Sequence, residues 1–377
     1  MRIGFKHLAG LAVLAGVGAL VVAWSGLVSV AASSGHWPPV AWFLHYTMEQ
    51  AVETQSMGIE PPPDLSAPER VALGAGHYAG GCMPCHGAPG EPRSPVAMSM
   101  LPPPTWLPTD VPKWEPRHLF WIVQHGIKYS GMPHWPTQDR PDEVWSVVAF
   151  LLRLPELDAA GYRRLAYGPE ADAERVATDQ ASVVDPRRVP QERILANCVR
   201  CHGRDGARAP AGMPTIGGQG ETYLVATLRA YAEGKRASGI MQPLAQALDE
   251  EAIIDLARHY AAQPWPAADD GTPASPELLA RGERIAREGI PTAGVPACAS
   301  CHGPPVRYPH YPQIAGQEPD FIARQLELFR DGVRGGTAFA HLMMGFARRL
   351  TDADIEAVAA FYGRSRDAGA RAAADRP

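Results

Sequence analysis

All six cysteines of the sequence occur in one repeated arrangement, in which two cysteines enclose two other residues and a histidine follows directly. The three copies are Cys82-Met83-Pro84-Cys85-His86, Cys198-Val199-Arg200-Cys201-His202 and Cys298-Ala299-Ser300-Cys301-His302. On one helical turn, two such thiols can each form a thioether to a haem vinyl group, and the histidine then lies beneath the iron. The arrangement is the attachment signature of c-type haem. We therefore expect three covalently bound haems c, with His86, His202 and His302 as proximal ligands.

Other uses of paired cysteines fit the sequence less well. A zinc ribbon separates its two Cys-x-x-Cys pairs by about 15 to 20 residues, whereas the pairs here begin at residues 82, 198 and 298. A thioredoxin-like redox motif lies beside a βαβ pattern, which the sequence lacks, and structural disulfides would leave the three histidines unexplained. Zinc and thiol chemistry are therefore the weaker interpretations.

An electron-transfer haem has a second axial ligand, and methionine opposite histidine raises the reduction potential. An internal repeat locates candidates in the last two units, because residues 214–219 read PTIGGQ and residues 312–317 read PQIAGQ. Beyond a four-residue insertion, the repeat aligns Met241 with Met343. We predict that these two methionines ligate the second and third irons.

The first unit has its own candidate ligand, Met132, in an extended Ser-Gly-Met-Pro segment ahead of a predicted helix. His125 and His134 are the alternatives to Met132, and Met344 is the alternative to Met343. A lone methionine more often fills core space than binds a metal. We assign that structural role to the other methionines near the motifs, Met98, Met100 and Met213.

The segments around the motifs predict helices. Each unit ends in an apolar-periodic segment with acidic residues at its start, which suits the positive end of a helix dipole; these segments are 141–152, 249–260 and 352–361. Shorter helices are expected before the first and third motifs, at 68–78 and 276–287, whereas the stretch from Pro190 before the second is short. No strand-rich segment interrupts the scheme, so the sequence predicts an all-α fold.

The amino terminus starts with charged residues and continues with a long apolar run. Arg2 and Lys6 precede a run from Leu8 to Ala31, and no further Asp, Glu, Lys or Arg appears until Glu49. This run is longer than the ~20 residues that span a bilayer, and longer than the about 7 to 15 of a signal-peptide core. The positive residues ahead of it place the rest of the chain on the outer side of the membrane. A retained anchor is expected, and a cleaved signal, which would leave a soluble periplasmic protein, is the alternative.

These elements and the shifts in composition give the expected organisation. Polar stretches and stretches rich in Pro, Ala and Asp are typical of linkers. Each haem-binding domain is small for a self-sufficient core, so the haem would form much of its hydrophobic centre. In chain order we expect a transmembrane helix at 1–35, domains at 66–155, 190–263 and 276–365, linkers at 156–189 and 264–275, and a disordered tail at 366–377.

Composition limits the choice of partners. The chain is 46% hydrophobic and 20% charged, which is typical of folded protein. The net charge of -5 is spread along the chain without a basic patch, so no nucleic-acid partner is expected.

Residues 66–365 resemble class I cytochrome c domains in all three units. The last two units resemble the dihaem cytochromes of the c4 kind, through Gly218-Gln219, Gly316-Gln317 and their closing helices. The first resembles the monohaem domains of membrane dehydrogenase and oxidase subunits. The resemblance implies His/Met ligation and electron relay at the bacterial inner membrane, with haem domains in the periplasm. It also implies redox partners, such as a membrane dehydrogenase, a quinol-oxidising complex, a terminal oxidase or a soluble cytochrome.

An electron carrier is therefore expected rather than an enzyme. A haem enzyme such as a peroxidase or reductase needs an open iron position and polar groups for its substrate, and each unit here offers a methionine to close that position. The alternatives are a haem enzyme with one open iron and the cytochrome subunit of a periplasmic dehydrogenase complex. The three-haem subunits of alcohol and gluconate dehydrogenases tend to be anchored near their carboxyl terminus, whereas the apolar segment here lies at the start.

Overall fold

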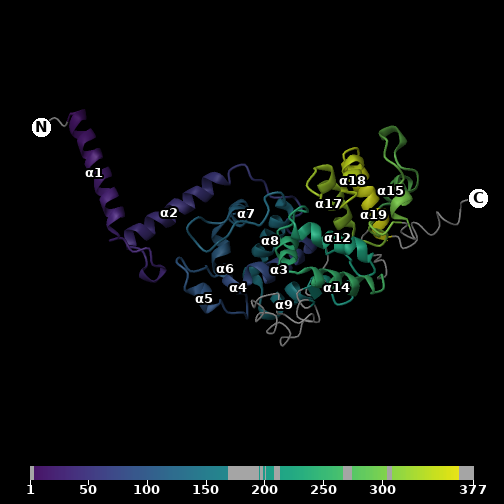
Figure 1. Cartoon of the computed structure of the whole chain (residues 1–377), viewed down its shortest axis with the longest axis horizontal. Coiled ribbons are helices and arrows are strands. Elements are labelled where there is room, and N and C mark those ends of the chain that lie inside the picture. Colours follow the sequence, from purple (N-terminus) through teal and green to yellow (C-terminus); the bar gives the residue numbers. More distant parts are fainter. Residues whose placement is uncertain are drawn as a thin grey trace, which may run out of the picture.

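The described part of the chain forms three consecutive helical units behind a protruding amino-terminal helix (Figure 1). The computed structural model describes residues 4–168, 195, 198–199, 201–207, 213–265, 274–303 and 308–364. Within these ranges only isolated β-bridges interrupt the helices and loops. The prediction of an all-α fold is confirmed there.

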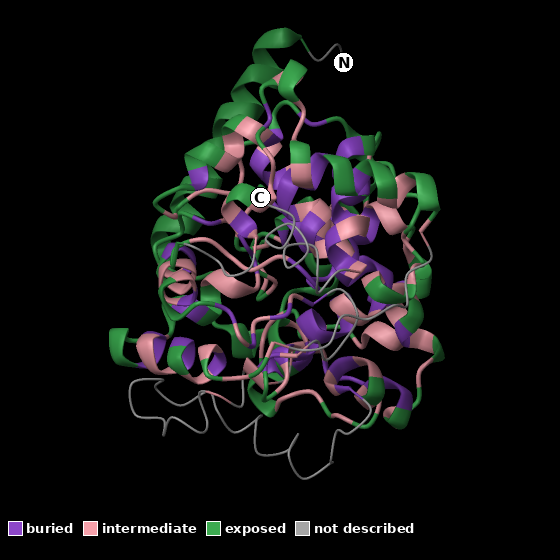
Figure 2. Ribbon diagram, turned by 90° about the vertical axis from the view of Figure 1, so that its right-hand side faces the viewer, coloured by how far each residue is buried: buried purple, intermediate pink, exposed green. Residues whose placement is uncertain are grey.

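The amino-terminal helix α1, Phe5–Ser25, is exposed along its whole length and stands apart from the three units (Figures 1 and 2). Its length and composition are those of a helix that could cross a membrane or serve as a signal sequence. The helix ends before the predicted apolar run does, because Gly26 adopts a positive φ of 69° that suits glycine. A short turn η1, Ala32–Ser34, and helix α2, Pro38–Gln55, lead to the first unit.

The first unit is built around the crossing of α3, Pro68–Gly81, and α8, Pro141–Arg153. The two helices approach so closely that a Cβ on Gly74 would collide with the backbone of Ser146. The short α4, Met83–His86, carries the first motif, and α7, Pro116–His125, covers α8. The remaining short elements are α5 (Pro95–Met98), α6 (Leu107–Asp110), η2 (Val111–Lys113) and η3 (Leu154–Glu156).

The segment predicted as a linker at 156–189 begins with a helix that belongs to the first unit. Helix α9, Ala159–Tyr167, starts at Asp158, whose carboxylate caps it by accepting from Gly161 N. Tyr162 is fully buried against Tyr78 of α3, with ring centroids 6.3 Å apart. The linker prediction is therefore wrong up to Tyr167, because one aromatic side chain docks this stretch on the core. Residues 169–189, and the predicted tail at 366–377, lie outside the described residues.

The second and third units repeat one helical arrangement. In the second, α12 (Glu221–Ala232), α13 (Met241–Gln246) and α14 (Glu250–Ala261) follow one another. The third has α15 (Pro276–Glu288), η5 (Pro291–Ala293), α16 (Ala299–His302), α17 (Pro319–Arg330), α18 (Ala340–Ala347) and α19 (Asp352–Arg364). The crossing of α15 and α19 at Gly282 matches the crossing at Gly74, since a Cβ there would collide with Ala357. Most of the stretch from Pro190 to the second motif, and most of the predicted linker at 264–275, lie outside the described residues.

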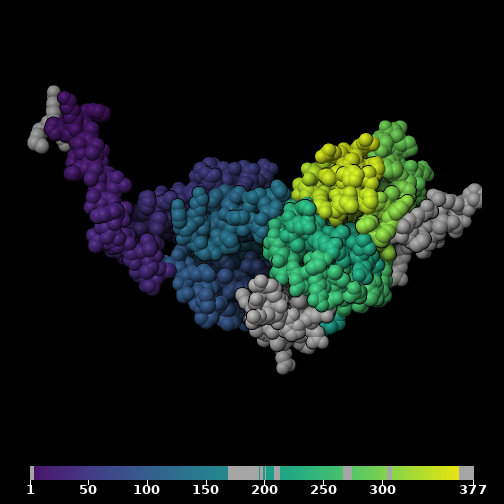
Figure 3. Space-filling model, in the orientation of Figure 1, coloured from purple at the N-terminus to yellow at the C-terminus, as the bar shows by residue number. Residues whose placement is uncertain are grey.

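The second and third units join through a reciprocal pair of glutamines. Gln317 accepts from Thr215 N at 2.8 Å and donates to Thr215 O at 2.9 Å. Gln219 accepts from Gln313 N at 3.0 Å and donates to Gln313 O at 2.7 Å. These residues are the matching positions of the sequence repeat, so each unit offers the other the same patch, as the subunits of a two-fold dimer do. Figure 3 shows the second unit, in green, in contact with both of its neighbours.

Candidate functional site

The three motifs occupy the same position in their units. The first cysteine of each motif, Cys82, Cys198 or Cys298, packs at the edge of the hydrophobic core of its own unit. Burial raises the pKa of the Cys82 thiol to about 12 and that of Cys298 to about 11. Within the described residues, no group of three or more His, Cys, Asp and Glu side chains could hold a metal ion.

The histidine of each motif is oriented by the same kind of hydrogen bond. The Nδ1 atom lies 3.0 Å from Thr105 O for His86, 3.4 Å from Pro214 O for His202 and 2.9 Å from Pro312 O for His302. A carbonyl can only accept, so the bond fixes the proton on Nδ1 and leaves Nε2 with its lone pair. Burial also lowers the pKa of all three imidazoles, which favours the neutral form that ligates metals.

The predicted distal methionines lie in three different settings. Met132 is half-buried in the loop after α7, and Met241 is the first residue of α13. Met343, on α18, packs against the core cluster that Cys298 also contacts, whereas Met344 packs only against a cluster around Phe329. The structure thus brings Met343 rather than Met344 to the core beside the third motif.

The other candidates near the motifs have ordinary positions. His125 and His134 are both exposed. Met213 is buried, as expected of a core methionine, but Met98 is 40% exposed, so its core assignment is wrong. Met98 ends the short surface helix α5 and points to solvent rather than into the unit. Met100 lies against Gly131, next to Met132.

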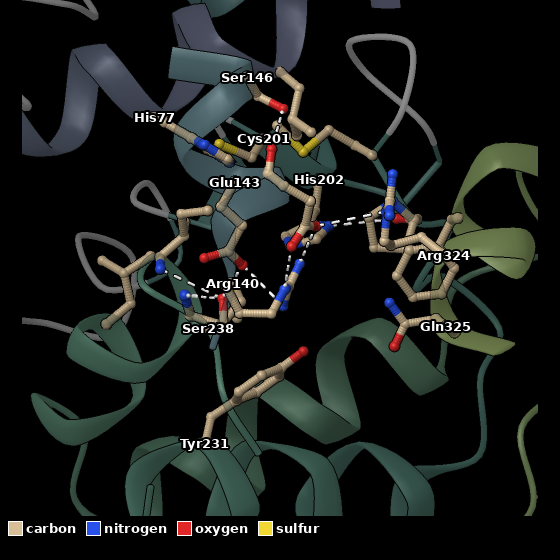
Figure 4. A pocket seen from close by; sticks show the side chains of 18 of the residues that line it. His77, Arg140, Glu143, Ser146, Cys201, His202, Tyr231, Ser238, Arg324 and Gln325 are labelled. Atoms are coloured by element: carbon tan, nitrogen blue, oxygen red, sulfur yellow. Dashed lines mark hydrogen bonds and ion pairs between the residues drawn. The ribbon is translucent and has the colours of Figure 1, made fainter. Parts of the chain in front are cut away.

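A cavity of about 670 Å³ opens beside the second motif (Figure 4). Its walls include Cys198, Cys201, His202 and Met241, which are the four predicted attachment and ligand residues of the second unit. Apolar side chains complete the second unit's share of the wall: Met213, Leu228, Leu244, Leu248 and Leu256. A thiol pair, a neutral imidazole and a thioether around an apolar cavity fit a covalently bound haem.

The first and third units supply charged side chains to the same cavity. Arg140 is the N-cap residue of α8 in the first unit, Glu143 lies on α8, and Arg324 comes from α17 of the third unit. Arg324 lies 3.7 Å from Asp142, so the first and third units also contact each other directly. Figure 4 shows Arg140 and Glu143 pointing toward Ser238 of the second unit. Sequence reasoning missed these residues, because no motif or repeat connects them to the second unit.

Two residues of α3 also face the second motif. A Cβ on Gly76 would lie 3.6 Å from the Sγ of Cys201 and 3.3 Å from Met213. The neighbouring His77 is buried, and its Nδ1 has no hydrogen-bond partner among the described residues. Burial, with a smaller effect of Arg140, lowers the pKa of His77 to about 3. The first unit therefore covers the second motif with a glycine and a neutral histidine.

Comparisons with known proteins agree with this geometry. Residues 69–151 match the family model of cytochrome c oxidase, cbb3-type, subunit III, and residues 192–259 match that of cytochrome c. Cytochrome c4 of Thiocapsa roseopersicina is 36% identical over 169 residues, which cover 44% of this chain and 84% of the relative. The thiosulfate dehydrogenase electron acceptor of Thiomonas intermedia (strain K12) is 35% identical over 167 residues, covering 44% of this chain and 76% of the relative.

Among solved structures, the crystal structure of reduced recombinant cytochrome c4 from Pseudomonas stutzeri is 30% identical, with a TM-score of 0.43. The match covers 47% of this chain and 96% of that chain. Cytochrome c domains hold covalent haem c, which supplies one-electron redox chemistry when bound. The chain therefore belongs to the cytochrome c family, as a class I cytochrome c for haem-based electron transfer whose last two units are like the dihaem cytochromes c4.

Proposed function

We propose that the chain binds three haems c and relays electrons between a periplasmic or quinol-linked donor and a terminal oxidase or soluble cytochrome. The observation that carries this proposal is the recurrence of one arrangement in three units, a Cys-x-x-Cys-His turn whose histidine Nδ1 is bound to a carbonyl. The cysteines would hold the macrocycles, and His86, His202 and His302 would ligate the irons. Met132, Met241 and Met343 would close the distal positions, which favours a carrier over an enzyme.

The contacts between units support a relay along the chain. Gly76 lies against Cys201, and α3 continues from Gly76 into Cys82 of the first motif. At ~1.5 Å per residue, these two positions are separated by about 9 Å of helix. The reciprocal glutamines then join the second unit to the third. Such short paths suit transfer in sequence between the first, second and third sites.

The comparisons suggest the kind of partner on each side. Relatives named as thiosulfate dehydrogenase electron acceptors favour a periplasmic dehydrogenase as the donor, or a place for this chain as a subunit of such a complex. The first unit matches a model of an oxidase subunit, which favours a terminal oxidase as the acceptor. We further propose that α1 anchors the chain in the bacterial inner membrane, with the haem domains in the periplasm.

An absorption spectrum of the purified full chain tests this function. We expect three haems c per chain, a methionine-to-iron charge-transfer band in the oxidised form, and no carbon monoxide binding in the reduced form. These results follow if every iron has two protein ligands. Stoichiometric carbon monoxide binding at one haem of undamaged protein would instead indicate an open iron and a haem enzyme.

A further inference from the structure

The segment that leads into Met241 of the second unit is held by a carboxylate of the first unit. Glu143, on α8, is buried and accepts hydrogen bonds from Ser238 Oγ at 2.7 Å and Gly239 N at 2.6 Å. Ser238 Oγ in turn accepts from the backbone N–H of Met241 at 3.1 Å and from that of Ile240 at 3.3 Å. Two consecutive hydrogen bonds thus connect the first unit to the backbone of the proposed iron ligand.

Two further side chains of the first unit close around this segment. Arg140 forms an ion pair with Glu143 at 2.9 Å and donates to Ala237 O at 3.0 Å. The Trp135 indole N–H donates to Glu143 at 3.3 Å. Its ring lies so close to Gly239 that a Cβ there would collide with it. The Glu143 carboxylate is therefore held by two donors of its own unit, Arg140 and Trp135, and the Trp135 ring leaves little space around Gly239.

The third unit carries the same repeat without this arrangement. The offset that aligns Met241 with Met343 places Ala340 where the second unit has Ser238, so the hydroxyl is absent. The segment ahead of Met343 is four residues longer, and it exposes Phe339 and Leu342 by 39% each. Met241 and Met343 thus occupy equivalent positions of the repeat but have different surroundings.

We propose that Glu143 is a positioning residue for Met241, through which the first unit sets the sulfur–iron bond of the second haem site. The inference rests on the proposed function in one respect, since it takes Met241 as an iron ligand. Groups that hold an axial ligand in place tune the affinity and the potential of a metal site, although they do not touch the metal. The first unit is then part of the second site as well as the neighbour that exchanges electrons with it.

Ser238→Ala tests the positioning role without changing any charge. The substitution removes the hydroxyl that joins Glu143 to Met241 N–H, and it installs the residue that the third unit already has at Ala340. In the haem-loaded full chain, we expect one of the three reduction potentials to fall, since a loosened methionine raises the potential less. The other two potentials should stay unchanged, and the methionine-to-iron band should lose up to a third of its amplitude.

Glu143→Gln is the second variant, since it keeps the size of the side chain but cannot accept from both donors as the carboxylate does. We expect the same partial loss of the band and carbon monoxide binding at one haem. The matched control is Asp354→Asn in the third unit, where a buried carboxylate binds Arg281 at 2.8 Å and caps Thr351. It should lower the melting temperature and leave all three potentials unchanged.

The outcomes separate the two proposals. If Ser238→Ala leaves the band, the carbon monoxide response and all three potentials unchanged, Glu143 has only a structural role and the inference is overturned. The same holds for a folded Glu143→Gln protein that differs from the wild type in melting temperature alone. A wild-type spectrum without the methionine band would instead contradict the proposed function.

Discussion

The second unit is held by its two neighbours in different ways. Toward the third unit it uses amides and cations at matching positions of the repeat: Gln219 and Gln317 bind the backbone of the opposite unit, and Arg236 and Arg334 donate to Gln325 and Tyr223. Toward the first unit it meets two buried charged side chains of that unit: Arg140 donates to Ala237 O, and Glu143 accepts from Ser238 and Gly239. The first contact is reciprocal and the second is one-sided.

The difference shows what each contact can specify. A reciprocal contact between copies of a repeat arises as soon as one self-complementary patch exists, because each copy provides both halves. A one-sided contact with buried charge discriminates more strongly, since a wrong partner would leave an unpaired charge out of water. The one-sided contact therefore specifies which domain covers the second motif, whereas the reciprocal contact mainly keeps two like units together.

The largest loss in the free energy of unfolding is expected when the contact between the first and second units is broken at Arg140. In Arg140→Ala the buried carboxylate of Glu143 loses its cation, and the half-buried carboxylate of Asp142 loses the nearer of its two arginines, Arg140 rather than Arg324. Removing one partner of a buried ion pair costs about 3–5 kcal/mol. Urea unfolding of the haem-loaded protein should show a loss of that size. Arg153→Ala is the control, because Arg153 is 54% exposed beside Glu156 and an exposed pair contributes about 0–1 kcal/mol. Equal losses in the two variants would contradict a buried, stabilising pair.

Much of the fold, and the similar placement of the three motifs, follows from the sequence. The three Cys-x-x-Cys-His copies predict the motif turns, and periodicity predicts the helices that became α3, α8, α14, α15 and α19. The repeat predicts that Gln219 and Gln317 are equivalent, and the structure places both at one interface, where Gln219 binds Gln313 and Gln317 binds Thr215. These features are local, or are repeated in the chain, so the residues themselves carry the signal.

The features that were missed depend on contacts between distant residues. Glu143 was noted only as an acidic residue at the start of a helix, yet its partner Ser238 is 95 positions away. Helix α9 lies in a stretch whose overall composition predicts a linker, and its place in the core depends on the packing of Tyr162, Leu165, Ala166 and Tyr167 against the first unit. Hydrophobic periodicity cannot predict such contacts, because it describes one segment of the chain and not the distant segment that packs against it.

Substitution of Gln219 or Gln317 should lower the free energy of unfolding by less than substitution of Arg140 does. The loss should be similar for the two glutamines. Gln219→Ala removes a side chain that satisfies the N–H and the carbonyl of Gln313, and Gln317→Ala removes one that does the same for Thr215 and also accepts from Glu318 N. Leaving such buried groups unpaired costs about 1–3 kcal/mol. Thermal unfolding should therefore show similar losses for the two variants. A loss in only one of them would mean that the contact is not reciprocal in energy.

The smallest expected change in the free energy of unfolding comes from His77, a neutral side chain at the contact between the first and second units. Its pKa is about 3 in the folded chain because of burial and Arg140, against an ordinary value of 6.5. Below pH 6.5 the unfolded chain therefore binds a proton that the folded chain does not, so the free energy of unfolding falls as the pH falls from about 6.5 to about 3. One such group changes that free energy by at most about 1.4 kcal/mol per pH unit.

His77→Leu removes this titration, so its unfolding free energy should fall less between pH 6 and pH 5 than that of the wild type, by up to that same amount. His77 is buried where the first unit covers the second motif. If the contact between these two units loosens, water should reach the imidazole ring, and the pKa of His77 should return toward its ordinary value. Arg140→Ala should therefore flatten the same slope as His77→Leu does, whereas Gln317→Ala, at the other contact, should leave it intact. If Gln317→Ala flattened the slope as well, the two contacts would be coupled rather than independent.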